Sequence, residues 1–258
     1  MELSFSLGSL FDAGSYGHVY QAQYKSPLLA NRNIAVKVLP LKPQNPDILN
    51  REIRNWKSVS SHDNVLCLEK VEYDKHNAYL VSEYCEKGSL HDHLRNKPMY
   101  TELQVKKIAK QIAEGILHCH KHNIAHCDIK PANIVVTKDG TYKICDFGNS
   151  QISMHEYLGL NQKGGTPMFV APERVERSEF GNNADVWAFG IIVYMLCCNG
   201  VKMPFHVNMK EKKVFYNEGL IFPPNMSKSS KDFITKCLAL NKKERPTSLD
   251  IYKHPFLN

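Results

Sequence analysis

Side chains able to do acid–base and ionic chemistry follow one another closely in the middle of the chain. The stretch His126-Cys127-Asp128-Ile129-Lys130-Pro131-Ala132-Asn133 contains an acid, a cation and an amide, and Asp146 follows in Asp146-Phe147-Gly148. Asp128 can accept a proton, Lys130 can neutralise an anion, and the side-chain oxygens of Asn133 and Asp146 are hard donors that suit Mg²⁺. Phosphoryl transfer needs positioning, charge neutralisation and an acceptor for the proton of the attacking hydroxyl. The residue types and spacing therefore point to that chemistry.

A second candidate site lies near the N-terminus, where glycines separate two predicted strands. In the segment 12–19, Gly14 and Gly17 lack a Cβ, so the backbone amides there can approach phosphate oxygens closely. Glycine-rich hairpins are common, so this segment alone does not establish phosphate binding. Lys37 lies in the next predicted strand, and Glu52 on the following predicted helix is a candidate partner for it. Taken alone, Lys37 is better interpreted as an ordinary surface lysine.

The elements that must position these residues divide the chain into a strand-rich first third and a helix-rich remainder. Strands are predicted over 7–11, 18–24, 34–39, 65–73, 78–83, 134–136 and 142–144. A helix is predicted to begin at Pro46 with Asn45 as its cap, and Thr101 and Gln104 have capping-box spacing before another helix. After an irregular segment over 146–173, everything is predicted to be helical, including a buried helix over 184–198. This is an α+β pattern with a boundary near 83–88.

Composition excludes several classes of protein. Of the 258 residues, 33 are Lys or Arg and 26 are Asp or Glu, which gives a net charge of +7. The longest apolar stretch, 186–198, is shorter than the roughly 20 residues that a membrane span needs, and the N-terminus lacks the features of a secretory signal. The basic excess over 202–245 has no accompanying aromatic–basic motif, so a solvated face is favoured over a nucleic-acid site. We expect no membrane span and no nucleic-acid partner.

The cysteines favour a reducing compartment. None of the eight cysteines forms a C-x-x-C pair, and with no secretion signal we expect reduced thiols in the cytoplasm or the nucleus. The run of histidines and cysteines over 118–127 resembles a metal site in composition. It lacks the paired spacing of a zinc site, so the end of a helix is the favoured interpretation.

With these motifs in order, the sequence resembles a eukaryotic protein kinase catalytic domain over nearly its whole length. The resemblance rests on Ala35-Val36-Lys37, Glu52, His126-x-Asp128, Asn133, Asp146-Phe147-Gly148, Gly165-Thr166-Pro167, Ala171-Pro172-Glu173, Asp185-Val-Trp-Ala-Phe-Gly190 and Glu244-Arg245-Pro246-Thr247. It implies a single domain, 1–258, with a two-lobed α+β fold. The small β-rich N-lobe would span 1–82, the hinge 83–88 and the larger helical C-lobe 89–258, with no accessory domain.

The resemblance also implies the cofactors, ATP and Mg²⁺, and a role for each site residue. Lys37, paired with Glu52, would hold phosphates; Asp128 would orient the substrate hydroxyl; and Lys130 would meet the γ-phosphate. Asn133 and Asp146 would bind the metal. The ATP-binding set would be Asp12, Ala13, Gly14, Ser15, Tyr16, Gly17, Val19, Ala35, Lys37, Ser82, Glu83 and Cys85, with Glu83 and Cys85 bonding adenine and Ser82 as a small gatekeeper.

Further residues would have structural roles in such a fold. The resemblance implies a buried ion pair between Glu173 and Arg245, and a buried Asp185 that braces the catalytic loop. It also implies a stack of aromatic side chains, formed by Trp56, His126 and Phe147.

The sequence departs from the family pattern at two positions. Asp12 stands where the first glycine of the phosphate loop is usual, and we expect it to raise the Michaelis constant for ATP modestly. Cys127 replaces the arginine that normally pairs with a phosphate on the activation segment. We therefore expect little dependence on phosphorylation of that segment, although it contains Ser150, Ser153 and Tyr157.

The resemblance favours an intracellular, monomeric serine/threonine kinase that acts on protein substrates, because Lys130 follows Asp128 at the spacing of that class. A pseudokinase that serves as a binding or scaffold module is the alternative. Against it, Lys37, Glu52, Asp128, Asn133 and Asp146 are all present. A lipid or small-molecule kinase is disfavoured by Ala171-Pro172-Glu173, which belongs to the polypeptide-substrate platform of the family.

Overall fold

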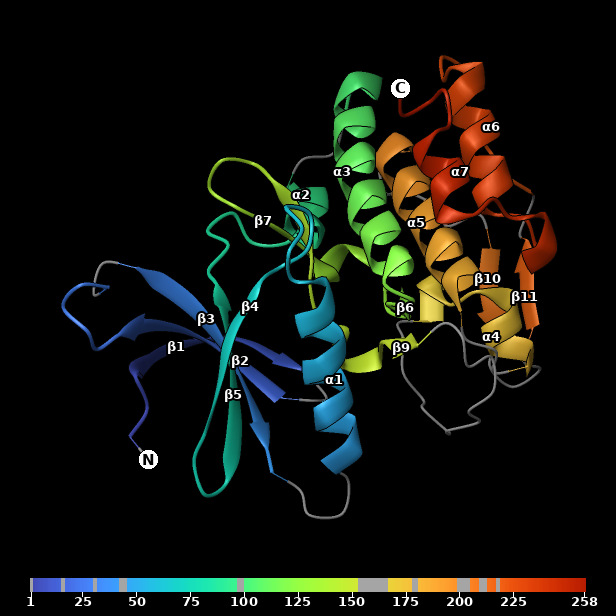
Figure 1. Ribbon diagram of the computed structural model, residues 1–258. Helices are drawn as coiled ribbons and strands as arrows, with labels where there is room; N and C mark the ends of the chain where they lie inside the picture. The colour runs from blue at the N-terminus through green and yellow to red at the C-terminus, as the bar shows by residue number, and fades with distance from the viewer. Residues whose placement is uncertain are drawn as a thin grey trace.

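The computed structural model describes residues 2–14, 17–29, 32–41, 46–96, 100–152, 167–177, 181–198, 205–208, 213–216 and 219–258. Of the residues singled out above, Ser15, Tyr16, Asn45, Ser153, Tyr157, Gly165 and Thr166 lie outside these ranges. The predicted two-lobed α+β fold is confirmed: a twisted sheet with one helix stands beside a larger helical body (Figure 1).

The N-lobe is built on a five-stranded antiparallel sheet with the order β1-β2-β3-β5-β4. The strands are β1 (Phe5–Gly14), β2 (Gly17–Tyr24), β3 (Asn33–Pro40), β4 (Leu68–Tyr73) and β5 (Asn77–Glu83). Val19 is paired with Lys37, and Ala35 with Ser82. Residues directly opposite in neighbouring strands share a face, and so do alternate residues of one strand. The register therefore brings these four predicted site residues to one face of the sheet.

The other face of the sheet has its own small core. Ile34, Val36, Tyr79 and Val81 alternate with the site residues along β3 and β5 and are buried together with Phe5. The buried residue Leu80, on the site face, belongs instead to the main core that continues into the C-lobe. Because both faces are packed, a shift of register by one residue would exchange Lys37 with an apolar neighbour.

Helix α1 (Pro46–Val59) packs between the sheet and the C-lobe (Figure 1). Pro46 opens the helix, where its missing N–H is harmless, and Asp47 lies in the first turn, near the positive end of the helix dipole. Its most buried side chains are Glu52, Asn55, Trp56 and Val59. The indole N–H of Trp56 donates to the Leu66 carbonyl at 2.6 Å, which fixes the end of the helix against the segment that follows.

That following segment joins the two lobes through backbone hydrogen bonds. The amide of Leu66 donates to the Ile144 carbonyl at 2.8 Å, and the amide of Ile144 donates to the Asn64 carbonyl at 2.9 Å. The prediction of a strand beginning at residue 65 was wrong: Val65 forms a parallel bridge with Ile144, and β4 begins only at Leu68. The β-branched Val65 correctly indicated an extended chain, but the residue with which it pairs, Ile144, lies in the other lobe.

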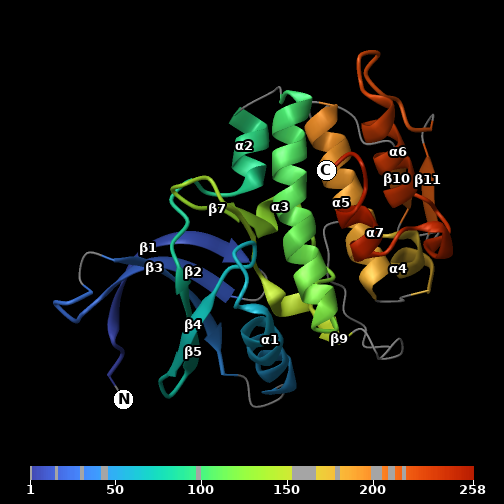
Figure 2. The ribbon, with the colours of Figure 1, turned by 45° about the horizontal axis from the view of Figure 1, so that its top comes forward.

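The C-lobe is organised around two long helices, α3 (Glu102–Lys121) and α5 (Asn182–Cys197), which lie side by side (Figures 1 and 2). The predicted capping box is confirmed, because Thr101 and Gln104 exchange hydrogen bonds at the start of α3. Helix α5 is buried nearly all round, as its apolar sequence predicted. The remaining helices are α2 (Leu90–Asn96), α4 (Pro172–Arg177), α6 (Lys228–Cys237) and α7 (Ser248–Tyr252), and the short strands are β6 (Ile124–Ala125), β7 (Ile134–Val136), β8 (Tyr142–Ile144) and β9 (Gln151–Ile152).

The prediction that everything after residue 173 is helical was wrong in one place. Strands β10 (Phe205–Asn208) and β11 (Lys213–Tyr216) form an antiparallel pair beside α4 (Figure 1). Each strand contains aromatic residues and a valine, which favour extended chain, but the lysines between them gave the segment a helical composition. Within the described ranges, no helix has both the length and the apolar character needed to span a membrane.

Candidate active site

Lys37 of β3 lies between two carboxylates that come from different parts of the chain. Its Nζ is 2.7 Å from Oε1 of Glu52 on α1 and 2.8 Å from Oδ1 of Asp146, which follows β8. Burial, the largest influence, would lower the pKa of Lys37, but the charges of Asp146 and Glu52 raise it above its usual value. Burial would likewise raise the pKa of Asp146, but the Lys37 ammonium lowers it to about 2. The lysine and Asp146 are therefore both charged at neutral pH.

Asp146 is aimed at Lys37 by an unusual backbone conformation and by the packing of the next residue. Its φ of 65° lies in the left-handed region, and its side chain caps the short 3₁₀ turn Phe147–Asn149. The buried Phe147 ring stacks on Trp56 at 6.2 Å between ring centroids and meets the edge of His126 at 4.9 Å. The three rings that the resemblance placed together are therefore in contact. They connect α1 to the segment that contains Asp146 and to the one that contains Asp128.

Donors converge on one oxygen of Asp128. Lys130 Nζ lies 2.8 Å from Asp128 Oδ2, Asn133 Nδ2 lies 3.1 Å from it and Asn149 Nδ2 lies 3.4 Å from it. Asn133 Nδ2 also donates to the backbone carbonyl of Asp128 at 2.9 Å. Among the described residues no group bonds to Oδ1, so this oxygen is the one available to accept a proton from a hydroxyl.

The backbone in front of Asp128 is braced from the core. Asp185 on α5 accepts hydrogen bonds from the amides of His126 at 2.7 Å and Cys127 at 2.8 Å, and its Oδ2 lies 2.9 Å from Nε2 of His120. Burial would raise the pKa of Asp185, but the hydrogen bond and charge of His120 hold it below its usual value. The brace expected from the resemblance is thus present as an ionised carboxylate.

The glycine-containing hairpin has a packing requirement as well as its proposed binding role. Asp12 is paired with Val19, Ala13 with His18 and Gly14 with Gly17. A Cβ on Gly17 would lie 2.6 Å from the Val38 carbonyl oxygen, so this residue must be glycine for β2 to approach β3. The side chains of residues 12–16 lie outside the described part, and their roles stay predictions.

Ser82 lies on the site face of the sheet, and Glu83, the last residue of β5, follows it. Ser82 is buried, and its hydroxyl is 3.5 Å from the Ala35 carbonyl. Glu83, the next residue, has its carboxylate 2.9 Å from Nζ of Lys143 on β8. This ion pair links the end of β5 to the C-lobe. The contact with adenine that the resemblance implies would use only the Glu83 carbonyl.

The oxygens near Asp146 and Asn133 fit a magnesium ion. Asn133 uses its Nδ2 for Asp128, and its Oδ1 has no partner among the described residues. Oδ1 of Asp146 accepts from Lys37 and from the Gly148 amide, while its Oδ2 likewise has none there. The described residues contain no group of three or more His, Cys, Asp or Glu side chains placed to hold a metal. Such a small protein donor set suits Mg²⁺, which completes its shell with water and phosphate oxygens.

The predicted structural ion pair is present in the C-lobe. Arg245 donates to both oxygens of Glu173, at 2.7 and 2.6 Å, and both side chains are buried. The guanidinium also donates to the carbonyls of Asn183 at 3.0 Å and Ala239 at 2.8 Å. This satisfied network anchors the start of α4.

Sequence reasoning missed several residues of the site. Asn149 reaches Asp128, and Asn55 on α1 donates to the carbonyl and hydroxyl oxygens of Ser150 at 3.3 and 3.1 Å. Phe11 on β1 meets the hinge residue Tyr84 edge to face at 5.9 Å. Phe11 could have been found from its position directly before Asp12, whereas nothing in the sequence pointed to Asn149 or Asn55.

The comparisons with known proteins agree with this geometry. The family model for the protein kinase domain matches residues 5–257. Calcium-dependent protein kinase 5 of Plasmodium falciparum (isolate 3D7) is 34% identical over 252 residues, which cover 93% of this chain and 43% of that protein. Serine/threonine-protein kinase pakG of Dictyostelium discoideum is 30% identical over 262 residues, covering 100% of this chain and 22% of that protein.

The Aurora kinase of Dictyostelium discoideum is 29% identical over 263 residues, covering 98% of this chain and 65% of that protein. The chain therefore spans less than two thirds of the length of each of these relatives. The family match runs nearly from end to end, so the chain belongs to the protein kinase domain family.

Proposed function

We propose that this chain transfers the γ-phosphoryl group of ATP to serine or threonine hydroxyls of protein substrates. The observation that carries the proposal is the assembled site. Lys37 contacts both Glu52 and Asp146, and the Oδ1 of Asp128 is left without a partner in the described part of the chain. ATP and Mg²⁺ are the proposed cofactors, with Asp146 Oδ2 and Asn133 Oδ1 as the protein's metal ligands.

The chain's own residues would divide the work as follows. Lys37 binds the α- and β-phosphates, and Glu52 keeps its ammonium group in place. Asp128 Oδ1 accepts the proton of the attacking hydroxyl as the new oxygen–phosphorus bond forms and the bond to the β-phosphate oxygen breaks. Lys130, 2.8 Å from Asp128 Oδ2, neutralises charge on the transferred group. Mg²⁺ held by Asp146 and Asn133 would supply further neutralisation of the phosphate charge.

The test is phosphorylation of an arrayed peptide library with Mg-ATP by the purified chain. Asp128→Asn removes the proton acceptor while keeping the shape, so we expect transfer to fall by about 100-fold or more. Asp63→Asn makes the same chemical change at an exposed carboxylate and is the matched control, expected to retain full activity. Signal confined to serine and threonine peptides supports the class.

The pseudokinase alternative makes a different prediction in the same experiment. A scaffold would transfer no phosphate in the unmodified chain, and Asp128→Asn would change nothing measurable. The complete set of charged residues around Lys37 weighs against that outcome.

For location, we propose a reducing intracellular compartment, because the thiols of Cys85, Cys119 and Cys237 are buried and unbridged.

A further inference from the structure

The residue in front of the catalytic aspartate has a constrained backbone. Cys127 has a φ of 64°, in the left-handed region that a residue with a Cβ rarely adopts. Its amide donates to Asp185 Oδ1 at 2.8 Å, and its side chain is 2% exposed. A strained backbone persists only where its surroundings hold it, and the Asp185 contact holds one side of this residue.

The other side of Cys127 is held by an arginine that the sequence analysis did not single out. Nη1 of Arg174 donates a hydrogen bond to the Cys127 carbonyl. This carbonyl belongs to the peptide unit that leads directly into Asp128. A charge-assisted hydrogen bond to it therefore fixes the plane from which the Asp128 side chain projects.

The helix that bears Arg174 is itself held in place. It lies on α4, and the residue before it, Glu173, is held by both guanidinium nitrogens of Arg245 at 2.7 and 2.6 Å. A rigid connection thus runs from the buried Glu173–Arg245 pair, through α4, to the catalytic loop. Between the loop and the residues before α4 lies a cavity of only about 10 Å³, lined by Asp128, Phe169 and Arg174 among others. The loop therefore has little room to move when Arg174 is in place.

We propose that Arg174 is a positioning residue for phosphoryl transfer, which aims Asp128 by holding the Cys127–Asp128 peptide unit from α4. The inference rests on the proposed function, since it concerns the aim of the proposed proton acceptor. Cys127 has a short buried side chain in place of the arginine expected at its position. Arg174 supplies a guanidinium group beside the catalytic loop from another part of the fold, and it does so without a phosphate group.

The experiment compares Arg174→Ala and Arg174→Lys with Glu176→Ala, an exposed position on the same helix. For Arg174→Ala we expect kcat to fall by about 10- to 100-fold, because small misplacements of a catalytic group have effects of that size. The Michaelis constant for ATP should stay within about twofold, since Lys37 and the hinge are untouched, and Glu176→Ala should behave as the unmodified chain. Arg174→Lys should lie in between, since it keeps the charge but not the planar fork.

Chemical rescue separates positioning from general stability. Removing the guanidinium enlarges the cavity beside Asp128, so millimolar guanidinium or methylguanidinium should recover part of the kcat of Arg174→Ala. The unmodified chain should gain nothing under the same conditions. Loss of activity that appears together with a lower melting temperature and no rescue would overturn the proposal in favour of a structural role.

The outcomes also distinguish this proposal from the proposed function. An unmodified chain that transfers no phosphate contradicts both. An active chain whose Arg174→Ala variant keeps its kcat within twofold contradicts only the positioning role. If Arg174→Ala does not fold, Arg174→Lys decides: a kcat lowered about threefold or more at an unchanged melting temperature supports the proposal, and full activity overturns it.

Discussion

At the scale of single residues, the site depends on charge that is buried yet balanced. Lys37 faces two carboxylates, so the trio has a net negative charge while Asp146 stays ionised. Removing one partner of such a buried group leaves an uncompensated charge, which is the costly change. The trio therefore favours a further cation beside Asp146, in agreement with the proposed binding of magnesium and with the Oδ2 of that residue, which has no hydrogen-bond partner among the described residues.

Ser82 gives a prediction at the same scale. If it is the gatekeeper, its small side chain leaves room behind adenine for ATP-competitive inhibitors with bulky substituents, which should inhibit the unmodified chain. Ser82→Met should raise their inhibition constants by about 100-fold, since the longer side chain fills that space. Inhibitor titration against both proteins at matched ATP tests this.

An inhibitor of the same class without the bulky group is the control, and its inhibition constant should change little. Equal potency of the bulky compounds on both proteins would show that Ser82 has another role.

At the scale of elements, α3 lies very close to the segment that follows α1, and this close approach fixes where α1 ends. A Cβ on Gly115 of α3 would lie 2.6 Å from the Asn64 carbonyl oxygen and 2.9 Å from Ile144 Cδ1. Gly115→Ala should lower the free energy of unfolding by about 1–3 kcal/mol through this overlap. Helix propensity alone would change the free energy of unfolding in the opposite direction, because alanine is favoured over glycine in a helix by about 1 kcal/mol. Denaturant titration measures the difference.

The matched control is Lys107→Ala, at an exposed position of the same helix, which should change stability by no more than about 0.5 kcal/mol. A stabilised Gly115→Ala protein would mean that the loop after α1 moves away at no cost.

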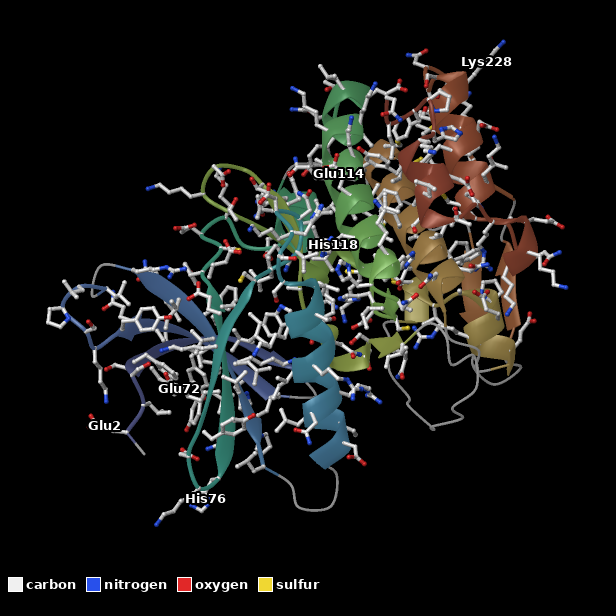
Figure 3. The ribbon with its side chains drawn as sticks, viewed as in Figure 1. Glu2, Glu72, His76, Glu114, His118 and Lys228 are labelled. Atoms are coloured by element: carbon white, nitrogen blue, oxygen red, sulfur yellow. The ribbon has the colours of Figure 1, made fainter. Side chains whose placement is uncertain are left out.

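Three histidine rings meet at the same junction, and the one on α3, His118, makes stability depend on pH. The His118 ring lies 4.6 Å from His62 and 4.3 Å from His122, and Figure 3 places His118 on the side of α3 near the end of α1. Burial, followed by the charges of His62 and His122, lowers the pKa of His118 below its ordinary 6.5. The unfolded chain therefore binds the proton first, and stability falls as the pH drops below 6.5.

We expect His118→Phe to lose less stability than the unmodified chain between pH 7 and pH 5, because it cannot be protonated there. Melting temperatures measured across that range test this, with His91→Gln, an exposed change on α2, as the control. Parallel curves for His118→Phe and the unmodified chain would contradict the assignment.

How much the sequence could predict varied with the kind of contact. The strands of the N-lobe, the capping box before α3 and the motif residues could be predicted, because each rests on local periodicity or on a resemblance. Val65 could not be placed, since its pairing partner, Ile144, lies in the other lobe. Arg174 and Asn149 were missed for the same reason: their significance lies in contacts with Cys127 and Asp128 that only the folded chain creates.

At the scale of the whole molecule, the contacts of the catalytic loop bear on regulation. Cys127 offers no cation to a phosphate, and Ser150, a hydroxyl residue of the segment after Asp146, is fully buried with its Oγ donating to Phe147 O at 2.6 Å. We expect equal activity before and after phosphatase treatment, measured as kcat on a peptide substrate. Complete dephosphorylation is verified by mass spectrometry, and a loss of more than about tenfold would contradict the expectation.

The seam between Leu66 and Ile144 has a mechanical consequence for the molecule. The end of α1 beside Trp56 is fixed to the C-lobe by this seam, while the end at Pro46 is far from it (Figure 1). The Trp56 end of α1 is therefore held against the C-lobe. We expect a movement of the sheet relative to the C-lobe to displace the Pro46 end of α1 more than the end that the seam holds, with Glu52 lying between the two.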